Sequence, residues 1–259
     1  MSIKIGYAGD RKISVEILSY ILEQGIAPSL LFVSDPQRAS HRDELISLCS
    51  HLNNRTIVDG SKIREPETIE KIKHENLDYL ICVHFPYIIP SEILNLPRIG
   101  VLNLHPAFLP YNRGWNTPTW AILDGTPFGA TLHFMDTSLD TGDIIHQKRL
   151  TVAVTDTADS LYKRVLCLEK DVFMEAWPSL INSTFSRKSQ KNLEGTAHKK
   201  GDLGSIQRIT LNEKIELRRF IDTLRALTTN NIRESAYFEM DGERYRLQLI
   251  VKKDLKDEP

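Results

Sequence analysis

The side chains best suited to chemistry in this sequence lie in Asn103-Leu104-His105-Pro106 and in Leu139-Asp140-Thr141-Gly142. A carboxamide, an imidazole and a carboxylate form the minimum set for transferring an acyl group to an amine. The carboxamide can donate a hydrogen bond to the oxyanion that forms on the attacked carbonyl. An imidazole, whose ordinary pKa is about 6.5, can accept the proton that the amine loses. A carboxylate can hold that imidazole or relay the proton through water.

The element that carries the first two side chains explains how they can share one site. Residues 99–103 are typical of a short buried strand, which ends at His105. Side chains two residues apart on a strand face the same way, so we expect Asn103 and His105 to point into one space. Pro106 favours an extended backbone at His105, and open α/β sheets bind their ligands at the carboxyl edge of the strands. The alternatives are a strand-end pair without chemistry and, for Asp140, a simple turn.

Length and composition restrict the class of protein. A chain of 259 residues can bury one substantial core and carry a smaller appendage. The 33 Lys and Arg residues against 34 Asp and Glu residues leave no global charge that favours nucleic acid or an acidic membrane. Apolar runs such as 79–83 are too short to cross a bilayer, and a strand follows Met1 without signal-peptide features. Cys49, Cys82 and Cys167 show no C-x-x-C spacing, so we predict reduced core thiols in a cytoplasmic protein.

Hydrophobic periodicity predicts an α/β fold with a doubly wound, mostly parallel, Rossmann-like sheet. The predicted strands alternate with helices and cover residues 3–8, 29–33, 56–58, 79–83 and 99–103. The predicted helices follow Gly9-Asp10-Arg11, span 43–52 and begin at Pro66, and a short one covers 116–123. Two later strands over 129–135 and 144–150 should form an antiparallel pair at one edge, followed by a long helix over 158–177.

The chain is predicted to divide into three parts. Residues 1–182 form an N-terminal catalytic domain, 183–204 a polar linker or extended loop, and 205–259 a small helix and β-hairpin region. We expect a helix over 212–227 and a hairpin around Asp241-Gly242, a strong turn pair. Because an isolated two-stranded hairpin is only marginally stable, this region is a candidate homodimer interface.

Several linked motifs give the chain a family resemblance. Asn103-Leu-His105-Pro106-Ala-Phe-Leu109-Pro110, Arg113-Gly114, Gly129-Ala-Thr131-Leu-His133 and Leu139-Asp140-Thr-Gly142 occur in this order. Together they resemble the folate-dependent formyltransferases over roughly residues 1–180, and such a set is more specific than any single motif. The resemblance implies the formyltransferase fold, N10-formyltetrahydrofolate as co-substrate, no metal, and catalytic roles for Asn103, His105 and Asp140.

The same resemblance implies where the folate binds. Its pterin should lie between the loop after the 79–83 strand and the loop before Asp140. The residues implied are Phe85, Tyr87, Ile88 and Ile89 in the first loop and Asp136 and Leu139 in the second. Aromatic and aliphatic side chains at a strand's end could enclose a flat heterocycle. A plain apolar loop covering the sheet is the alternative.

His133 has two interpretations. It could line the substrate pocket, or it could join His105 and Asp140 as a metal ligand. The spacing matches no metal motif and direct transfer needs no metal, so we favour the pocket.

The resemblance also indicates the formyl acceptor. Trp115-Asn116 after Arg113-Gly114, and the segments 195–203 and 224–228, resemble the sugar N-formyltransferase branch. This implies transfer to the 4-amino group of a nucleoside-diphosphate-linked 4-amino-4,6-dideoxy sugar. As a whole, the chain resembles the GDP-perosamine N-formyltransferases that supply O-antigen and lipopolysaccharide synthesis.

Candidate contacts to this acceptor lie in four short segments of the sequence. They are Gly9, Arg11, Arg113, Gly114, Trp115, Asn116, His133, His198 and Lys199, with Lys200 beside the last. The basic groups could bind a diphosphate, and Trp115 and Asn116 could shape the sugar side. The alternatives are a packing role for Trp115 and a solvated basic loop at 198–200.

Three other functions compete with this interpretation. A methionyl-tRNA formyltransferase needs a five-stranded barrel that the short C-terminal region cannot build, and phosphate contacts that near-zero net charge does not favour. A formyltetrahydrofolate hydrolase would use the same three groups with water. It normally carries a preceding regulatory domain, whereas here the catalytic-type strand begins at Ile3. A folate- or nucleotide-binding regulator without turnover would not need all three catalytic positions filled.

Overall fold

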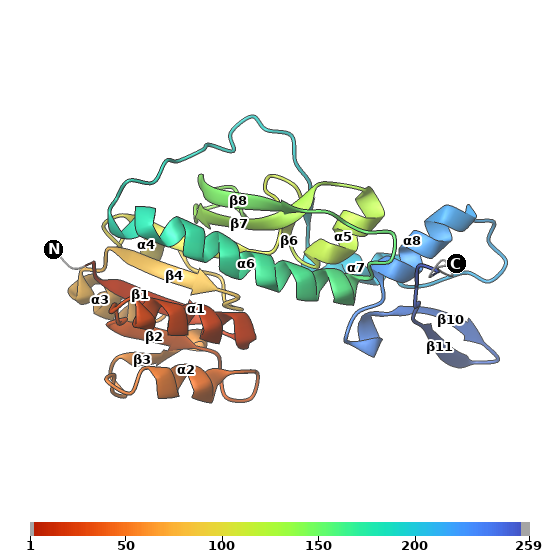
Figure 1. Ribbon diagram of the computed structural model, residues 1–259. Helices are drawn as coiled ribbons and strands as arrows, with labels where there is room; N and C mark the ends of the chain where they lie inside the picture. The colour runs from red at the N-terminus through yellow and green to blue at the C-terminus, as the bar shows by residue number, and fades with distance from the viewer. Residues whose placement is uncertain (1–2, 255–259) are drawn as a thin grey trace. The chain divides into compact units, whose positions relative to one another are not determined.

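The candidate residues of the catalytic motifs lie on a sheet that is mostly parallel and has antiparallel pairing toward one edge. The computed structural model describes residues 3–254. Its strands include β1 Ile5–Gly9, β2 Leu30–Val33, β3 Ile57–Asp59, β4 Tyr79–Val83, β5 Gly100–His105, β7 Phe128–Phe134 and β8 Ile144–Leu150. Among the described residues these seven form one sheet, in the order β3-β2-β1-β4-β5-β7-β8 (Figure 1). The first five pair in parallel and β7 pairs antiparallel to β5, which confirms the predicted mostly parallel α/β fold.

Helices cover both faces of this sheet. They are α1 Arg11–Glu23, α2 Arg42–Leu48, α3 Pro66–Glu75, α4 Ser91–Leu94 and α6 Ala158–Ile181, with a 3₁₀ turn η1 Gly60–Lys62. Ile72 of α3 and Ile93 of α4 pack with Leu80 and Cys82 of β4 in one core cluster. On the opposite face, the Tyr79 hydroxyl donates to the carbonyl of Leu180 in α6. Successive side chains of β4 point to opposite faces of the sheet, so Leu80 and Cys82 contact the helices on one face and Tyr79 contacts α6 on the other.

The chain divides into two compact units, each built from separated segments. The first comprises the described residues up to His105 together with 131–147 and 169–192, and the second comprises 106–130, 148–168 and the described residues from 193 onward. The predicted domain boundaries stay a prediction.

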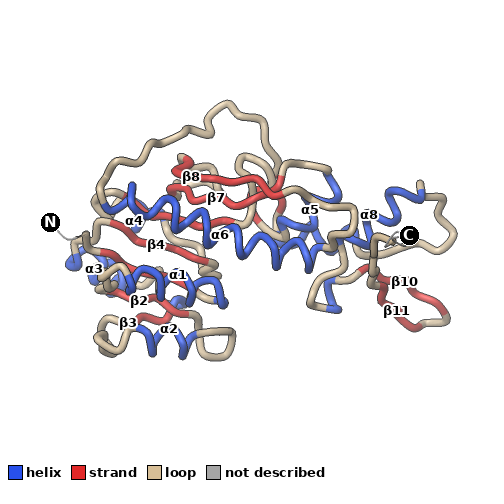
Figure 2. Tube along the Cα trace, in the orientation of Figure 1, coloured by secondary structure: helices blue, strands red, loops and turns tan. Residues whose placement is uncertain are grey.

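The second unit contains short strands and helices. They include β6 Arg113–Gly114, α5 Thr117–Asp124, β9 Ala197–His198, η2 Lys200–Asp202, α7 Leu203–Ile206, α8 Leu217–Ala226, η3 Ile232–Glu234, β10 Ala236–Met240 and β11 Glu243–Leu247. The predicted hairpin is confirmed: β10 and β11 pair antiparallel, and Asp241 and Gly242 between them take positive φ of 54° and 81° (Figure 2). Leu203, Leu227 and Ala236 form a small buried cluster that fixes this region.

Three expectations from the sequence differ from the structure. The segment 183–204 is not uniformly extended, because it contains β9 and η2 and its Lys188 forms a β-bridge with Ile144. The helix predicted over 212–227 begins only at Leu217. Cys49 and Cys82 are buried as predicted, but Cys167 is exposed, so the prediction of a core thiol was wrong there.

Within residues 3–254, the helices are all too short or too polar to span a lipid bilayer.

A buried hydrogen-bonded pair holds the end of β4. His84, which follows β4 with a positive φ of 51°, places its Nε2 at 3.0 and 2.9 Å from the two carboxylate oxygens of Glu169. The Glu169 side chain is fully buried and that of His84 is 9% exposed. Removing one member of such a buried pair takes a hydrogen-bond partner from the other, which is strongly destabilising.

We predict that Glu169→Ala lowers the free energy of unfolding by about 3 kcal/mol, because His84 then loses a buried partner. Glu169→Gln keeps a hydrogen-bond acceptor and should lose less. The exposed neighbour Lys170, which pairs with Glu16 at the surface, is the control, and Lys170→Ala should change stability by at most about 0.5 kcal/mol. Urea unfolding followed by circular dichroism measures all three variants. Equal stabilities for Glu169→Ala and Lys170→Ala would contradict the prediction.

Candidate functional site

Strand pairing places three candidate side chains together. Asn103 and His105 lie on β5, and the antiparallel neighbour β7 puts His133 opposite Asn103 and Thr131 opposite His105. The Asn103 Nδ2 lies 3.3 Å from the His133 Nε2. The rings of His105 and His133 meet edge to face, with centroids 6.2 Å apart. The shared face predicted for Asn103 and His105 therefore also holds His133.

The carboxylate of Asp140 joins this group from the turn after β7. Its Oδ1 lies 3.4 Å from the Asn103 Nδ2 and its Oδ2 lies 3.6 Å from the His105 Nε2. Both separations exceed the usual 2.7–3.2 Å of a good hydrogen bond, and catalytic contacts often shorten only when substrate binds. One carboxylate thus bridges the carboxamide and the imidazole.

His133 is held as a neutral ring. Its Nδ1 lies 2.7 Å from the carbonyl oxygen of Phe134, which can only accept, so Nδ1 carries the proton. Nε2 is then left to accept from the Asn103 amide. Burial lowers the pKa of His133, although the charge of Asp140 opposes that shift. The 3.7 Å separation between His133 and Asp140 is therefore not an ion pair near neutral pH.

The turn that carries Asp140 is fixed by Gln190, which sequence reasoning missed, and by Asp136, which the resemblance assigned to the folate site. The side chain of Gln190 donates through Nε2 to the carbonyls of Asp140, at 3.1 Å, and Gly142, at 2.7 Å. On the other side, Asp136 Oδ1 accepts from the Thr141 hydroxyl at 2.6 Å. Gln190 lies in the segment predicted to be a linker, and no local pattern marks its partners.

The residues implied to bind folate lie in the same unit. Phe85 and Tyr87 form a tilted aromatic pair 5.2 Å apart, and the Tyr87 hydroxyl accepts from a backbone amide at Asp35. Ile89 is buried, so of the two adjacent isoleucines only Ile88, at 74% exposure, faces solvent. In the second loop Leu139 is 51% exposed and Asp136 is exposed. Each loop thus presents an aliphatic side chain to solvent.

Gly9 and Arg11 also belong to this unit, at the carboxyl end of β1. A Cβ at Gly9 would lie 1.8 Å from the Ser14 hydroxyl, so only glycine fits there. Asp10 caps α1. Burial alone raises the pKa of Asp10, but hydrogen bonds from the backbone of Arg11, Ser40 and His41 and from the Ser40 hydroxyl outweigh it and hold that pKa below its usual range. The side chain of Arg11 is exposed.

The remaining candidate residues lie side by side in the second unit. β6 pairs with β9, which sets Arg113 opposite Ala197 and Gly114 opposite His198. The Trp115 amide donates to the His198 carbonyl at 3.0 Å, and the Lys200 Nζ lies 5.0 Å from the Trp115 ring centre.

Within this group the side chains have distinct environments. The His198 ring stacks on Trp120, with centroids 3.9 Å apart, and its Nε2 lies 3.0 Å from Asp124 Oδ2. Trp115 is 43% exposed, Lys199 is exposed and Asn116 takes a positive φ of 55° before α5. The interpretation of 198–200 as a simple solvated loop is therefore wrong for His198.

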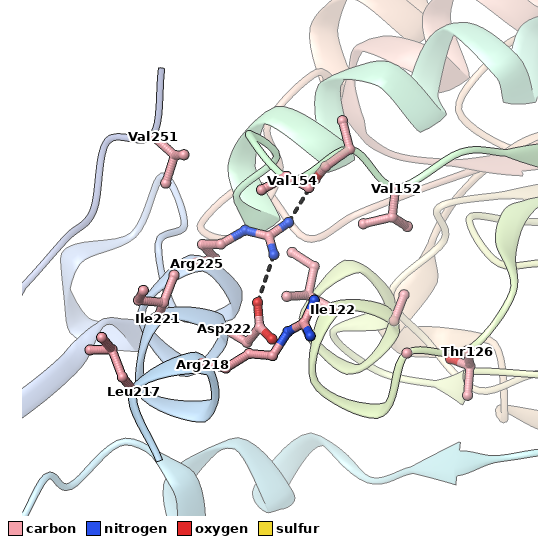
Figure 3. A pocket seen from close by; sticks show the side chains of 13 residues that line it. Ile122, Thr126, Val152, Val154, Leu217, Arg218, Ile221, Asp222, Arg225 and Val251 are labelled. Atoms are coloured by element: carbon pink, nitrogen blue, oxygen red, sulfur yellow. Dashed lines mark hydrogen bonds and ion pairs between the residues drawn. The ribbon is translucent and has the colours of Figure 1, made fainter. Parts of the chain in front are cut away.

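A separate cavity of about 610 Å³ lies within the second unit (Figure 3). Ile122 of α5, Leu217 and Ile221 of α8, Val154 and Val251 line it with others. None of the candidate site residues lines this cavity, so the cavity is not part of the candidate site.

Within residues 3–254, no group of three or more His, Cys, Asp and Glu side chains is arranged to hold a metal ion.

Comparison with known proteins assigns the family. Residues 23–177, more than half of the chain, match the family model described as Formyl transferase. The chain belongs to the formyl transferase family. Residues 202–253 of this formyltransferase match a second model, described as the N-formyltransferase dimerization C-terminal domain.

Individual relatives agree with this assignment. The dTDP-4-amino-4,6-dideoxyglucose formyltransferase of Mycobacterium tuberculosis strain H37Rv is 29% identical over 177 residues, which cover 68% of this chain and 74% of the relative. A sugar N-formyltransferase structure from Shewanella sp. FDAARGOS_354 superposes with a TM-score of 0.83 at 25% identity, covering 98% of this chain and 99% of that one. The formyltransferase PseJ from Anoxybacillus kamchatkensis has a TM-score of 0.58 at 25% identity, covering 78% and 88%, and its structure contains UDP-4,6-dideoxy-4-formamido-L-AltNAc and tetrahydrofolate. These similarities and the C-terminal match support the sugar N-formyltransferase branch, as the sequence motifs predict.

The neutral His133 gives this formyltransferase a pH-dependent stability. In the unfolded chain the ring takes up a proton as the pH falls through about 6.5, whereas the buried ring resists protonation to a lower pH. Protons therefore favour the unfolded state in that window, and stability is lost as the pH falls. We predict that His133→Gln reduces the loss of unfolding free energy between pH 7 and pH 5.5 by about 1 kcal/mol.

Urea unfolding at several pH values measures that difference between wild type and variant. Nitrogen NMR of the ring in the wild type is an independent check and should report a proton on Nδ1 alone. An identical pH dependence in wild type and variant would contradict the prediction.

Proposed function

We propose that this formyltransferase moves a formyl group from N10-formyltetrahydrofolate to the 4-amino group of a nucleoside-diphosphate-linked 4-amino-4,6-dideoxy sugar. The observation that carries the proposal is the Asp140 carboxylate set between the Asn103 amide and the His105 imidazole. The amino sugar named for the Mycobacterium tuberculosis relative and the two ligands named for PseJ support this choice of acceptor and donor.

The proposed donor site fits the described loops. Exposed Ile88 and Leu139 offer apolar surface on the two loops assigned to the pterin, and burying them against a flat heterocycle is favourable. Phe85 and Tyr87 of the first loop pack against the core cluster, and the Asp136 carboxylate accepts a hydrogen bond from Thr141 in the second loop.

The proposed chemistry begins with attack of the sugar amine on the formyl carbon. A new carbon–nitrogen bond forms while the carbonyl electrons move to oxygen, giving a tetrahedral oxyanion. The Asn103 Nδ2 lies 3.4 Å from Asp140 Oδ1, which is a long hydrogen bond. One of its N–H groups can therefore turn toward the oxyanion of the intermediate and stabilise that negative charge. The other N–H stays on the neutral His133, which fixes the plane of the amide.

Proton transfer completes the proposed reaction. His105 accepts a proton from the attacking nitrogen, and the adjacent Asp140 carboxylate stabilises the resulting imidazolium. When the intermediate collapses, the bond between the formyl carbon and N10 breaks and the proton passes to N10. The products are a formamide on the sugar and tetrahydrofolate.

Residues of the second unit are proposed to recognise the acceptor. Arg113, His198 and Lys199 are candidate diphosphate contacts. Trp115 and Asn116, with Gly114 between them and Arg113, are proposed to shape the sugar side. The relative is named for a dTDP-linked sugar and the PseJ structure contains a UDP-linked one. Our prediction of GDP-perosamine and of a role in O-antigen and lipopolysaccharide synthesis therefore stays a prediction.

We predict that His105→Ala and Asp140→Ala each lower kcat by at least about 100-fold while the proteins remain folded, because each removes the base or its partner. Asn103→Ala should lower kcat by about 100-fold through loss of the oxyanion donor. His146→Ala is the matched control: its imidazole pairs with Glu175 at the surface, and its activity should equal that of the wild type.

The assay measures tetrahydrofolate formation with a panel of dTDP-, GDP- and UDP-linked 4-amino-4,6-dideoxy sugars, with charged initiator tRNA and with water alone. Transfer to one of the sugars supports the proposal and identifies the nucleotide. Turnover with tRNA or water alone, or folate binding without any turnover, would replace it by one of the alternative functions. Near-normal kcat in His105→Ala or Asp140→Ala would overturn the assigned roles.

We also propose that the formyltransferase is a homodimer, with a second copy covering the cavity of the second unit. Leu217, Ile221 and Val251 in its wall fall within the segment that matches the dimerization domain. Leu217 is 70% exposed and Val154, across the cavity, is 78% exposed. Charged side chains also line the cavity: Arg225 pairs with Asp222 and with two backbone carbonyls, and Arg218 lies beside them (Figure 3).

We predict that the double variant Leu217→Glu, Ile221→Glu weakens dimerization by at least about 100-fold, because two unpaired carboxylates would have to be buried. Sedimentation velocity over a range of concentrations measures this. Met174→Glu, at an exposed apolar position on α6, is the control and should remain dimeric. A wild type that is monomeric at micromolar concentration would contradict the prediction.

A further inference from the structure

The turn that presents Asp140 is held by a side chain outside the catalytic motifs. Gln190 is 3% exposed, and its Nε2 lies 3.1 Å from the Asp140 carbonyl and 2.7 Å from the Gly142 carbonyl. A carboxamide nitrogen has two protons, so one side chain can satisfy both carbonyls.

This turn has a backbone that needs such support. Asp140 takes a φ of 53°, in the left-handed region that residues with a side chain rarely adopt. Such a conformation persists only where the surroundings determine it. Gly142 packs directly on the end of β7, because an added Cβ would lie 1.9 Å from the Phe134 carbonyl.

Gln190 is itself fixed by backbone pairing. Two residues earlier, the backbone of Lys188 exchanges both hydrogen bonds with Ile144, each at 2.8 Å. Ile144 begins β8, two residues after Gly142. The segment 188–190 therefore runs beside the turn and delivers the carboxamide to it.

We infer that Gln190 is a positioning residue that sets the Asp140 carboxylate against Asn103 and His105. The inference rests on the proposed formyl transfer. Rotation of the Asp140 backbone would change both separations of its carboxylate, 3.4 Å to Asn103 and 3.6 Å to His105, at once. A displacement of about 1 Å at a catalytic group can cost about 100-fold in rate.

The test uses two substitutions at Gln190 and one at its exposed neighbour in the full chain. Gln190→Leu keeps the volume and removes both donors, and Gln190→Glu places an acceptor against two carbonyls. We expect either variant to lower kcat by about 10- to 100-fold while KM for each substrate changes less than about 3-fold. Ser189→Ala should match the wild type.

A pH profile separates positioning from a general loss of structure. The activity of Gln190→Glu relative to wild type should rise as the pH falls, because a protonated carboxyl regains one donor. Gln190→Leu should show no such recovery. A kcat within 2-fold of wild type for both variants, or a loss that lies in KM alone, would overturn the inference.

Hydrogen exchange measured by mass spectrometry provides a readout that needs no substrate. Peptides covering residues 139–144 should exchange faster in Gln190→Leu than in wild type or Ser189→Ala, while peptides from β1 and β4 stay protected. Unchanged exchange in residues 139–144 would overturn the role of Gln190. Because this measurement needs no substrate, it can contradict that role whether or not the wild type transfers a formyl group. If Gln190→Leu does not fold, Gln190→Glu carries the same measurements.

Discussion

The candidate site depends on the register between β5 and β7. Because side chains alternate along a strand, a slip by one residue would move Asn103 and His105 to the opposite face of the sheet. Leu102 and Leu104 prevent that slip, since both are almost fully buried and a shifted register would exchange them for polar groups. The hydrophobic core therefore determines which side chains meet in the candidate site, because the register that buries the two leucines also places the Asn103 carboxamide opposite His133.

This dependence explains which parts of the site follow from sequence. The face shared by Asn103 and His105 follows from the period of a strand, and the sheet and the hairpin at Asp241-Gly242 follow from local patterns that need no distant partner. His133 is different. Its place opposite Asn103 depends on pairing between strands separated by about 30 residues, and sequence motifs indicated only that it belonged near the site.

The contacts that fix the loops could not be predicted, for a physical reason. Gln190 and Glu169 act through side chains whose partners lie 50 and 85 residues away, and such contacts leave no periodic signal. A polar composition predicted a linker at 183–204, but the buried Gln190 carboxamide and the backbone pairing of Lys188 with Ile144 attach this segment to the core. For Cys167 the sequence predicted a buried thiol and the structure has an exposed one, since a side chain on a long helix can face solvent as readily as the core.

The charge balance of the site follows from the state of His133. Were both imidazoles protonated, they would compete for one carboxylate, and Asp140 could not favour proton uptake at His105 in particular. Burial keeps His133 neutral and the Phe134 carbonyl fixes its proton on Nδ1, so the ring contributes an acceptor for Asn103 and no charge. Gln190 likewise orients the turn with uncharged hydrogen bonds. In the proposed mechanism, the Asp140 carboxylate is thus left to stabilise the imidazolium formed as His105 takes the amine's proton.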